Sequence, residues 1–227
     1  RLGIEYNKKK LFSMYHYFRI GQDKDGPVVK AVVREGDPEP NEDKDKSTDW
    51  QPSKDYKARG WAYTREDIHE EGDEQTYGSM TAAAINALIL IRDELVADKA
   101  HKGRWKKKVK GVTMEEQCNN MIGDGLAWMV TNWTMANNPR RGMYRYYYYL
   151  YTVERLGMLG GIDMIGGNDW YHEGALVLLK DQKDTGMWDI DMEIDPSDIY
   201  NTCYALLFLK KATSGVDQPI PVITGDE

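Results

Sequence analysis

The chain has 227 residues, a formal net charge of −7 at pH 7 and a sequence pI near 5.2. This charge excludes the broad basic field typical of nucleic-acid-binding proteins, so we expect no nucleic-acid partner. Mean hydropathy is −0.67, and no apolar run reaches the ~18 residues of a membrane span, so we expect no transmembrane segment.

The chain starts at Arg1 and shows no initiator methionine and no apolar signal segment. We therefore expect a processed or partial product that belongs to a larger chain or complex, and export is consistent with this start. The compartment stays open. Cys118 and Cys203 both lie in helical patterns and do not indicate a disulfide framework.

Residues 1–59 have a different residue pattern from the rest of the chain. Two segments, "LFSMYHYFRI" and "PVVKAVVR", flank the polar turn "GQDKDG". This pattern predicts a small β-hairpin that pairs Ser13–Ile20 with Val28–Arg34. Residues 35–55 are rich in proline and charge, which predicts a long exposed loop. We expect this insertion to follow the tail of a helix that starts upstream of the chain.

From residue 60 the sequence pattern is typical of helices. Residues 80–95 are apolar nearly all round, which predicts a buried helix with Ser79 as its N-cap. A basic linker follows. Residues 114–134 then predict an amphipathic helix capped by Thr113, with two glutamates in its first turn.

The second half repeats this alternation. Residues 144–159, which open with six tyrosines in eight positions, and residues 199–209 predict buried inner helices. Residues 169–181, opened by Asn168 or Asp169, predict a half-exposed outer helix. Glycine–aromatic signals near the inner helices indicate an internal repeat of helix pairs, and thus a stacked or circular array. Residues 214–227 are expected to form a flexible tail.

The segment "HEGALVLLKDQKDTGMW" resembles the QW repeat of terpenoid cyclases and protein prenyltransferase β subunits, with Gln182, Gly186 and Trp188 at the motif positions. "GWAYT…GSMTAAAINALILI" and "SDIYNTCYALLFLKKA" resemble an inner helix and the closing inner helix of the same superfamily. The chain is most similar to bacterial squalene-cyclase-like "prenyltransferase and squalene oxidase repeat" proteins. The resemblance implies an all-α, partial α/α toroid over residues 60–213, because about five helices cannot close a ring of about twelve.

Prenyltransferase β subunits bind zinc with an aspartate and a cysteine on one inner helix and a histidine on the closing helix. The resemblance implies where these positions fall in this chain. In this chain the histidine position falls on Asn201, and the aspartate–cysteine region falls near Tyr144 and Tyr146. Asparagine and tyrosine are poor zinc ligands. We therefore expect the zinc site to be absent and expect no resident cofactor.

The acidic segment "WDIDMEIDPSD" lacks the D-x-D-D pattern of class II terpenoid cyclases. In an extended segment, one side would carry four carboxylates, which are Asp189, Asp191, Glu193 and Asp195. Three interpretations stay open. The segment could be a solvated acidic loop followed by an N-cap at Asp198, a weak calcium or magnesium site, or a source of a catalytic acid.

Other candidate groups carry less signal. The histidines, His16, His69, His101 and His172, are scattered without metal-ligand spacing and are expected in surface or core roles. Cys203 is expected to be a core thiol, since no base lies three or four residues away on its helix.

Two functions from different classes remain. Four tyrosines at i, i+3, i+4 and i+7 spacing, Tyr144, Tyr147, Tyr148 and Tyr151, are expected to line a cavity together with Asn201. The favoured function is a binding or scaffold module whose partner is a protein, a glycan or an apolar small molecule. The alternative is a terpenoid cyclase-like enzyme that stabilises carbocations on aromatic faces.

Overall fold

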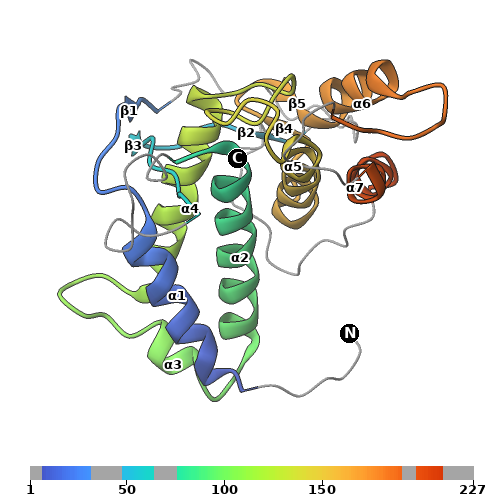
Figure 1. Ribbon diagram of the computed structural model, residues 1–227. Coiled ribbons are helices and arrows are strands. Elements are labelled where there is room, and N and C mark those ends of the chain that lie inside the picture. The colour runs from blue at the N-terminus through green and yellow to red at the C-terminus, as the bar shows by residue number, and fades with distance from the viewer. Residues whose placement is uncertain (1–6, 32–47, 64–75, 191–197, 212–227) are drawn as a thin grey trace, which may run out of the picture.

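The structure is a computed structural model that describes residues 7–31, 48–63, 76–190 and 198–211. This part of the chain is mostly helical (Figure 1), with α1 Lys9–Gly21, α2 Gly78–Ala97, α3 Lys102–Trp105, α4 Met114–Thr131, α5 Tyr146–Gly160, α6 Trp170–Asp181 and α7 Asp198–Leu209. Its strands are two residues long and comprise β1 Val28–Val29, β2 Asp49–Trp50, β3 Tyr56–Lys57, β4 Met164–Ile165 and β5 Asn168–Asp169. Among these residues, no helix combines the length and apolarity that a membrane crossing requires.

The predicted pairing of Ser13–Ile20 with Val28–Arg34 is wrong, because residues 13–20 lie inside α1. A helix at this position buries Phe12 and Tyr15, which stand three residues apart on one face. Both rings meet the indole of Trp105 edge-on, at centroid distances of 6.4 and 5.2 Å. The two buried aromatic residues of this segment therefore follow the period of a helix. The expected tail of an upstream helix at residues 1–6 lies outside the described residues.

Short strands do occur near the N-terminus, but their partners are distant in sequence. β1 pairs antiparallel with β3, and β2 pairs parallel with β4, which in turn pairs antiparallel with β5. Trp50 in β2 is buried, so the described end of the predicted exposed loop is tied to the helical part of the chain. Residues 32–47 of that loop lie outside the described residues.

Helices α2 and α4 pack side by side and run in opposite directions. The Cys118 thiol, early in α4, donates to the carbonyl of Leu88, in the second half of α2. Gly125, later in α4, lies against Ile85, which is earlier in α2. The start of α4 agrees with the prediction. Thr113 accepts from the backbone N–H of Glu116 while the Glu116 carboxylate accepts from that of Thr113, which completes a capping box.

The start of α2 differs from the prediction, since the helix begins at Gly78 and Ser79 lies inside it. The cap comes instead from Asn138, whose Oδ1 accepts from the Ser79 N–H at 3.0 Å. Asn138 Nδ2 also donates to Ser79 Oγ at 3.1 Å and to the Tyr144 carbonyl at 2.9 Å. One buried amide therefore joins the N-terminus of α2 to the segment that leads into α5.

Helices α2 and α5 run side by side in the same direction. Their N-termini meet at Asn138, and further along Asn86 Nδ2 of α2 donates to the Thr152 carbonyl of α5 at 3.0 Å. α2 buries 14 of its 20 residues and α5 buries 11 of its 15. These two helices are the centre of the core, as predicted for residues 80–95 and 144–159.

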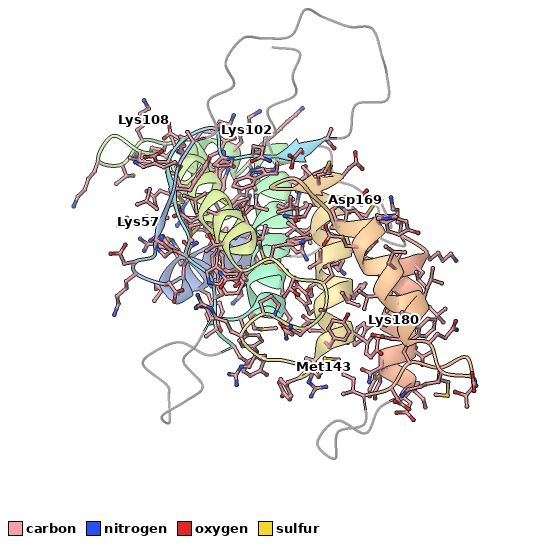
Figure 2. The ribbon with its side chains drawn as sticks, turned by 90° about the horizontal axis from the view of Figure 1, so that it is seen from above. Lys57, Lys102, Lys108, Met143, Asp169 and Lys180 are labelled. Carbon is pink, nitrogen blue, oxygen red and sulfur yellow. The ribbon has the colours of Figure 1, made fainter. Side chains whose placement is uncertain are left out.

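Helix α6 reverses direction and α7 reverses it again. Trp170, at the start of α6, packs on Gly157 near the end of α5 and edge-on against Phe208 near the end of α7. At the other end of α6, Leu178 accepts a hydrogen bond from the Trp188 indole, and the Trp188 N–H donates to Thr202 in the first half of α7. α7 therefore runs parallel to α5, and α6 runs antiparallel to both. Figure 2 shows α6, marked by Asp169 and Lys180, at the end of the molecule opposite Lys57.

The burial of α7 contradicts the prediction of a buried inner helix. Only Asn201, Ala205 and Phe208 of its 12 residues are buried. Cys203 is exposed, so the predicted core thiol at this position is wrong, whereas Cys118 is buried. The expected tail at residues 214–227 lies outside the described residues.

Candidate functional site

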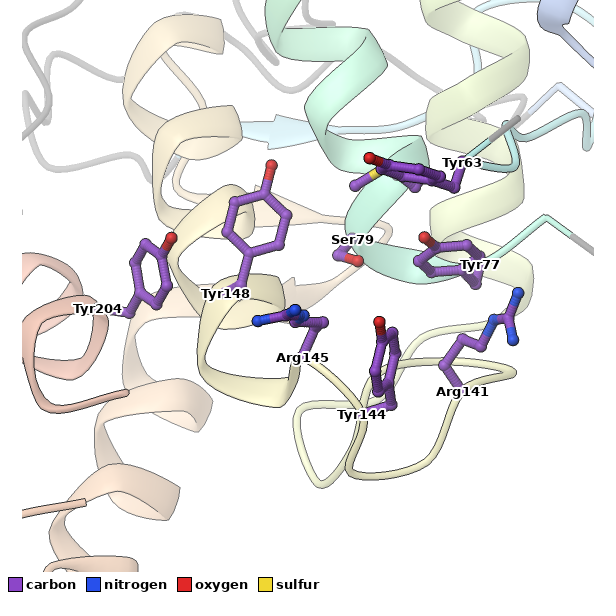
Figure 3. A pocket seen from close by; sticks show the side chains of 9 residues that line it. Tyr63, Tyr77, Ser79, Arg141, Tyr144, Arg145, Tyr148 and Tyr204 are labelled. Carbon is purple, nitrogen blue, oxygen red and sulfur yellow. The ribbon is translucent and has the colours of Figure 1, made fainter. Parts of the chain in front are cut away.

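A pocket of about 690 Å³ opens at the N-terminal ends of α2 and α5 (Figure 3). Its described lining combines tyrosines, two arginines, a serine and a methionine, and consists of Tyr63, Tyr77, Ser79, Met80, Arg141, Tyr144, Arg145, Tyr148 and Tyr204. The volume falls within the ~300–1,000 Å³ range of small-molecule sites.

The segment that connects α4 to α5 forms one wall of the pocket and contains a tight turn. The Asn138 N–H donates to the Gly142 carbonyl at 2.8 Å, and Gly142 has a positive φ of 59°. Arg145 also has a positive φ, of 55°, a conformation that non-glycine residues adopt rarely and at a cost. This backbone places Tyr144 before the helix, where it faces the pocket.

Both arginines of the pocket lie against tyrosine rings. The Arg141 guanidinium lies over the Tyr77 ring at 4.8 Å, and that of Arg145 lies over the Tyr144 ring at 5.4 Å. In such stacking the charged face of the guanidinium rests on the aromatic ring. The adjacent Arg140 points elsewhere, over the Trp128 ring, and its Nε donates to Asn132.

Two tyrosines of the pocket, Tyr77 and Tyr148, have raised pKa values, which favour the neutral phenol. Burial raises the pKa of Tyr77 to about 12, and the nearby phenols of Tyr144, Tyr148 and Tyr63 act in the same direction against Arg141. Burial also raises the pKa of Tyr148. Neutral hydroxyls can both donate and accept hydrogen bonds. The described lining holds no histidine, cysteine, aspartate or glutamate.

The buried phenols predict that stability falls at high pH. Burial raises the pKa of Tyr15, Tyr77 and Tyr147 to about 12, whereas unfolding returns each to about 10. Because the unfolded chain loses these protons first, their contribution to the free energy of unfolding is full below about pH 10 and is lost as pH rises toward 12. Urea unfolding measured across this range, together with tyrosinate absorbance, checks the prediction. A titration in which every tyrosine of the folded chain ionises with a midpoint near pH 10 would contradict it.

Only two of the five residues that were predicted to line a cavity do line the pocket. Tyr144 and Tyr148 line the pocket. Tyr147 turns to the other side of α5, where its hydroxyl donates to the Asp189 carbonyl at 3.4 Å. Tyr151 stacks on Tyr204 at 5.3 Å. Asn201 is buried in α7, outside the described lining, and its Nδ2 has no hydrogen-bond partner among the described residues.

The QW-like residues form one compact turn after α6. Gln182 Nε2 donates to the Gly186 carbonyl at 2.9 Å, and Gly186 has a positive φ of 82° that favours glycine. Trp188 is buried, and its indole N–H donates to Leu178 at 2.8 Å. The motif residues therefore fix the connection between α6 and α7 and do not reach the pocket.

The acidic segment is described only at its start. The Asp189 carboxylate lies 3.5 Å from Lys183 Nζ, while Asp191, Glu193 and Asp195 lie outside the described residues. Within the described ranges, no three His, Cys, Asp or Glu side chains are grouped to hold a metal ion. Of the histidines, His101 pairs with Asp98 at 2.6 Å, and His69 lies outside the described residues.

Seven of the nine described lining residues are not predicted from the sequence, namely Tyr63, Tyr77, Ser79, Met80, Arg141, Arg145 and Tyr204. A signal was present in "RRGMYR", where arginines flank a glycine turn directly before a tyrosine-rich helix. Such a turn at a helix start gathers its side chains at one end of the helix.

No family model matches the chain, and no curated protein or solved structure matches it either.

Proposed function

We propose that the chain is a ligand-binding module built on part of an α/α toroid of the squalene-cyclase-like type. The directions of the helices support this architecture. α2, α5 and α7 run in one direction as neighbours, while α4 and α6 run the opposite way beside them. Parallel inner helices that alternate in sequence with antiparallel outer ones are what a toroid repeat requires.

The observation that carries a binding function is the chemistry of the pocket. Its described lining offers five tyrosines and two arginines. Both residue types ordinarily titrate well above pH 7, whereas general acid–base catalysis needs a group that titrates near the working pH. The lining therefore supports recognition of a ligand over proton transfer to one.

The same lining indicates the kind of ligand. Tyrosine faces bind flat or apolar groups, and guanidinium groups bind carboxylates and phosphates through paired hydrogen bonds. We expect a small molecule that joins a ring to an anionic group, with the ring among Tyr77, Tyr144 and Tyr148 and the anion toward Arg145.

Titration of the chain with phenyl phosphate tests this proposal. Arg145→Gln is expected to weaken binding about tenfold, equivalent to ~1.4 kcal/mol, because a charge-assisted hydrogen bond is lost. Arg19→Gln serves as the matched control, since Arg19 is exposed on α1 and does not line the pocket. Isothermal titration calorimetry measures both variants, with phenol and inorganic phosphate as partial ligands. Equal affinities for the variant and the control, or no binding of phenyl phosphate, would contradict the proposal.

The alternative function, a terpenoid cyclase-like enzyme, draws support from the five tyrosine faces, which can stabilise a carbocation. Incubation with squalene and prenyl diphosphates tests it. Turnover that is lost in Tyr148→Ala, in the pocket, and kept in Tyr151→Ala, outside it, would favour the enzyme. An absence of product would leave the binding module as the better account.

A further inference from the structure

The outward face of α7 carries an apolar stripe with no covering element among the described residues. Ile199, Tyr200 and Leu206 are 70%, 64% and 54% exposed, and Leu207 and Cys203 are also exposed. The opposite face of the helix holds its buried residues and packs on α5 and α6. A helix that is apolar on its solvent side indicates an interaction surface. We call these five residues the α7 stripe.

The α7 stripe is symmetric about Cys203. Ile199 and Tyr200 stand four and three residues before it, and Leu206 and Leu207 stand three and four residues after it. On a helix these offsets fall on one face. The centre is occupied by a small side chain and both ends by large ones, so a reversed copy of the stripe presents the same profile.

We propose that a second copy of this chain docks on the α7 stripe, with the two α7 helices antiparallel and Cys203 at the two-fold axis. In this register Ile199 of one copy faces Leu207 of the other, and Tyr200 faces Leu206. Two-fold contacts of this kind are isologous, which means that both copies contribute the same surface.

Charge at the ends of the helix favours the antiparallel direction. Asp198, at the N-terminal end of α7, and Lys210, just past its C-terminal end, are both exposed. Antiparallel docking places the end of α7 that carries Asp198 beside the end of the other copy that carries Lys210. Parallel docking would place like charges and like helix ends together.

The small area of the α7 stripe limits the expected affinity of the dimer. An obligate dimer buries about 2,000 Å² or more, which five side chains on one 12-residue helix do not supply. We therefore expect reversible association with a dissociation constant in the micromolar range.

Sedimentation of the full chain over a series of micromolar concentrations tests the dimer. The chain is expected to shift from monomer to dimer, and Leu206→Glu is expected to weaken the association at least tenfold. Ile20→Glu is the matched control, because Ile20 is 58% exposed on α1 and should leave the association unchanged. A chain that stays monomeric throughout, or a dimer that Leu206→Glu does not affect, would overturn the proposal.

Disulfide formation tests the antiparallel register. With diamide as the oxidant, the two Cys203 thiols give up two protons and two electrons and are expected to join in a dimer. Cys118 should stay unreacted, because burial raises the pKa of its thiol to about 12. In a Cys203→Ser background, chains with Ile199→Cys are expected to cross-link to chains with Leu207→Cys when the two are mixed. Cross-linking of Ile199→Cys chains to one another instead would refute the antiparallel direction.

Discussion

Replacing Gly157 by alanine is expected to lower the free energy of unfolding by about 2 kcal/mol or more, as overpacking in a core does. Elsewhere in a helix the same change usually stabilises by ~1 kcal/mol, so the expected sign is the reverse of the usual one. The reason is the Trp170 indole, because a β-carbon on Gly157 would lie 2.5 Å from Nε1 and overlap the adjoining ring carbons. Trp170 is 1% exposed, and its Nε1 is fixed by a hydrogen bond to the Ile162 carbonyl at 2.8 Å.

Urea unfolding followed by circular dichroism measures this effect. Gly103→Ala in α3 is the matched control, since a β-carbon there meets nothing within 4 Å, and it should be neutral or slightly stabilising. If Gly157→Ala proved as stable as the parent chain, the close packing of α5 on α6 described above would be incorrect.

Replacing Asn138 by alanine is expected to destabilise the chain by about 2–4 kcal/mol, because three side-chain hydrogen bonds are lost in a buried site. Asn138 is 0% exposed, so water cannot replace its amide without rearrangement. The loss should also loosen the pocket, since Asn138 holds the start of α2 next to Tyr144. Affinity for phenyl phosphate is therefore expected to fall together with stability.

The neighbouring Asn137→Ala provides the comparison for this prediction. Asn137 is only half-buried, and no hydrogen bond of its side chain is described, so a change of less than about 0.5 kcal/mol is expected. In Asn138→Asp the carboxylate can still accept from the Ser79 N–H, but it cannot donate to Ser79 Oγ or to Tyr144 and it buries a charge. A loss of stability at least as large as that of Asn138→Ala is therefore expected.

Helices whose N-cap lies directly before them in the chain could be predicted from the sequence. The Thr113 cap of α4 and the Asp169 cap of α6 are local, because each depends on residues within one turn. The long apolar run of α2 has too few polar positions for an exposed helix. The sequence of α1 does not distinguish a helix from a strand, because Tyr15 and Tyr17 alternate as in a strand while Phe12 and Tyr15 fall on one helix face.

Burial and the pocket could be predicted only in part, because both depend on neighbours far along the chain. α7 is as apolar as a central helix, but the described structure supplies packing partners on one side only. The cap of α2 comes from Asn138, 59 residues after Ser79. Arg141 and Arg145 reach the pocket through left-handed backbone at Gly142 and Arg145, which composition does not reveal.

The shared direction of α2 and α5 separates the helical core from the residues that line the pocket. Two connections, the end of the segment that enters α2 at Tyr77 and the turn at residues 138–145, deliver their side chains to the same end of the helices. The core contacts at Asn86, Thr152 and Gly157 lie further along the helices. Exchange of the turn, with Asn138 kept, is therefore expected to change the lining of the pocket while leaving the helical core intact.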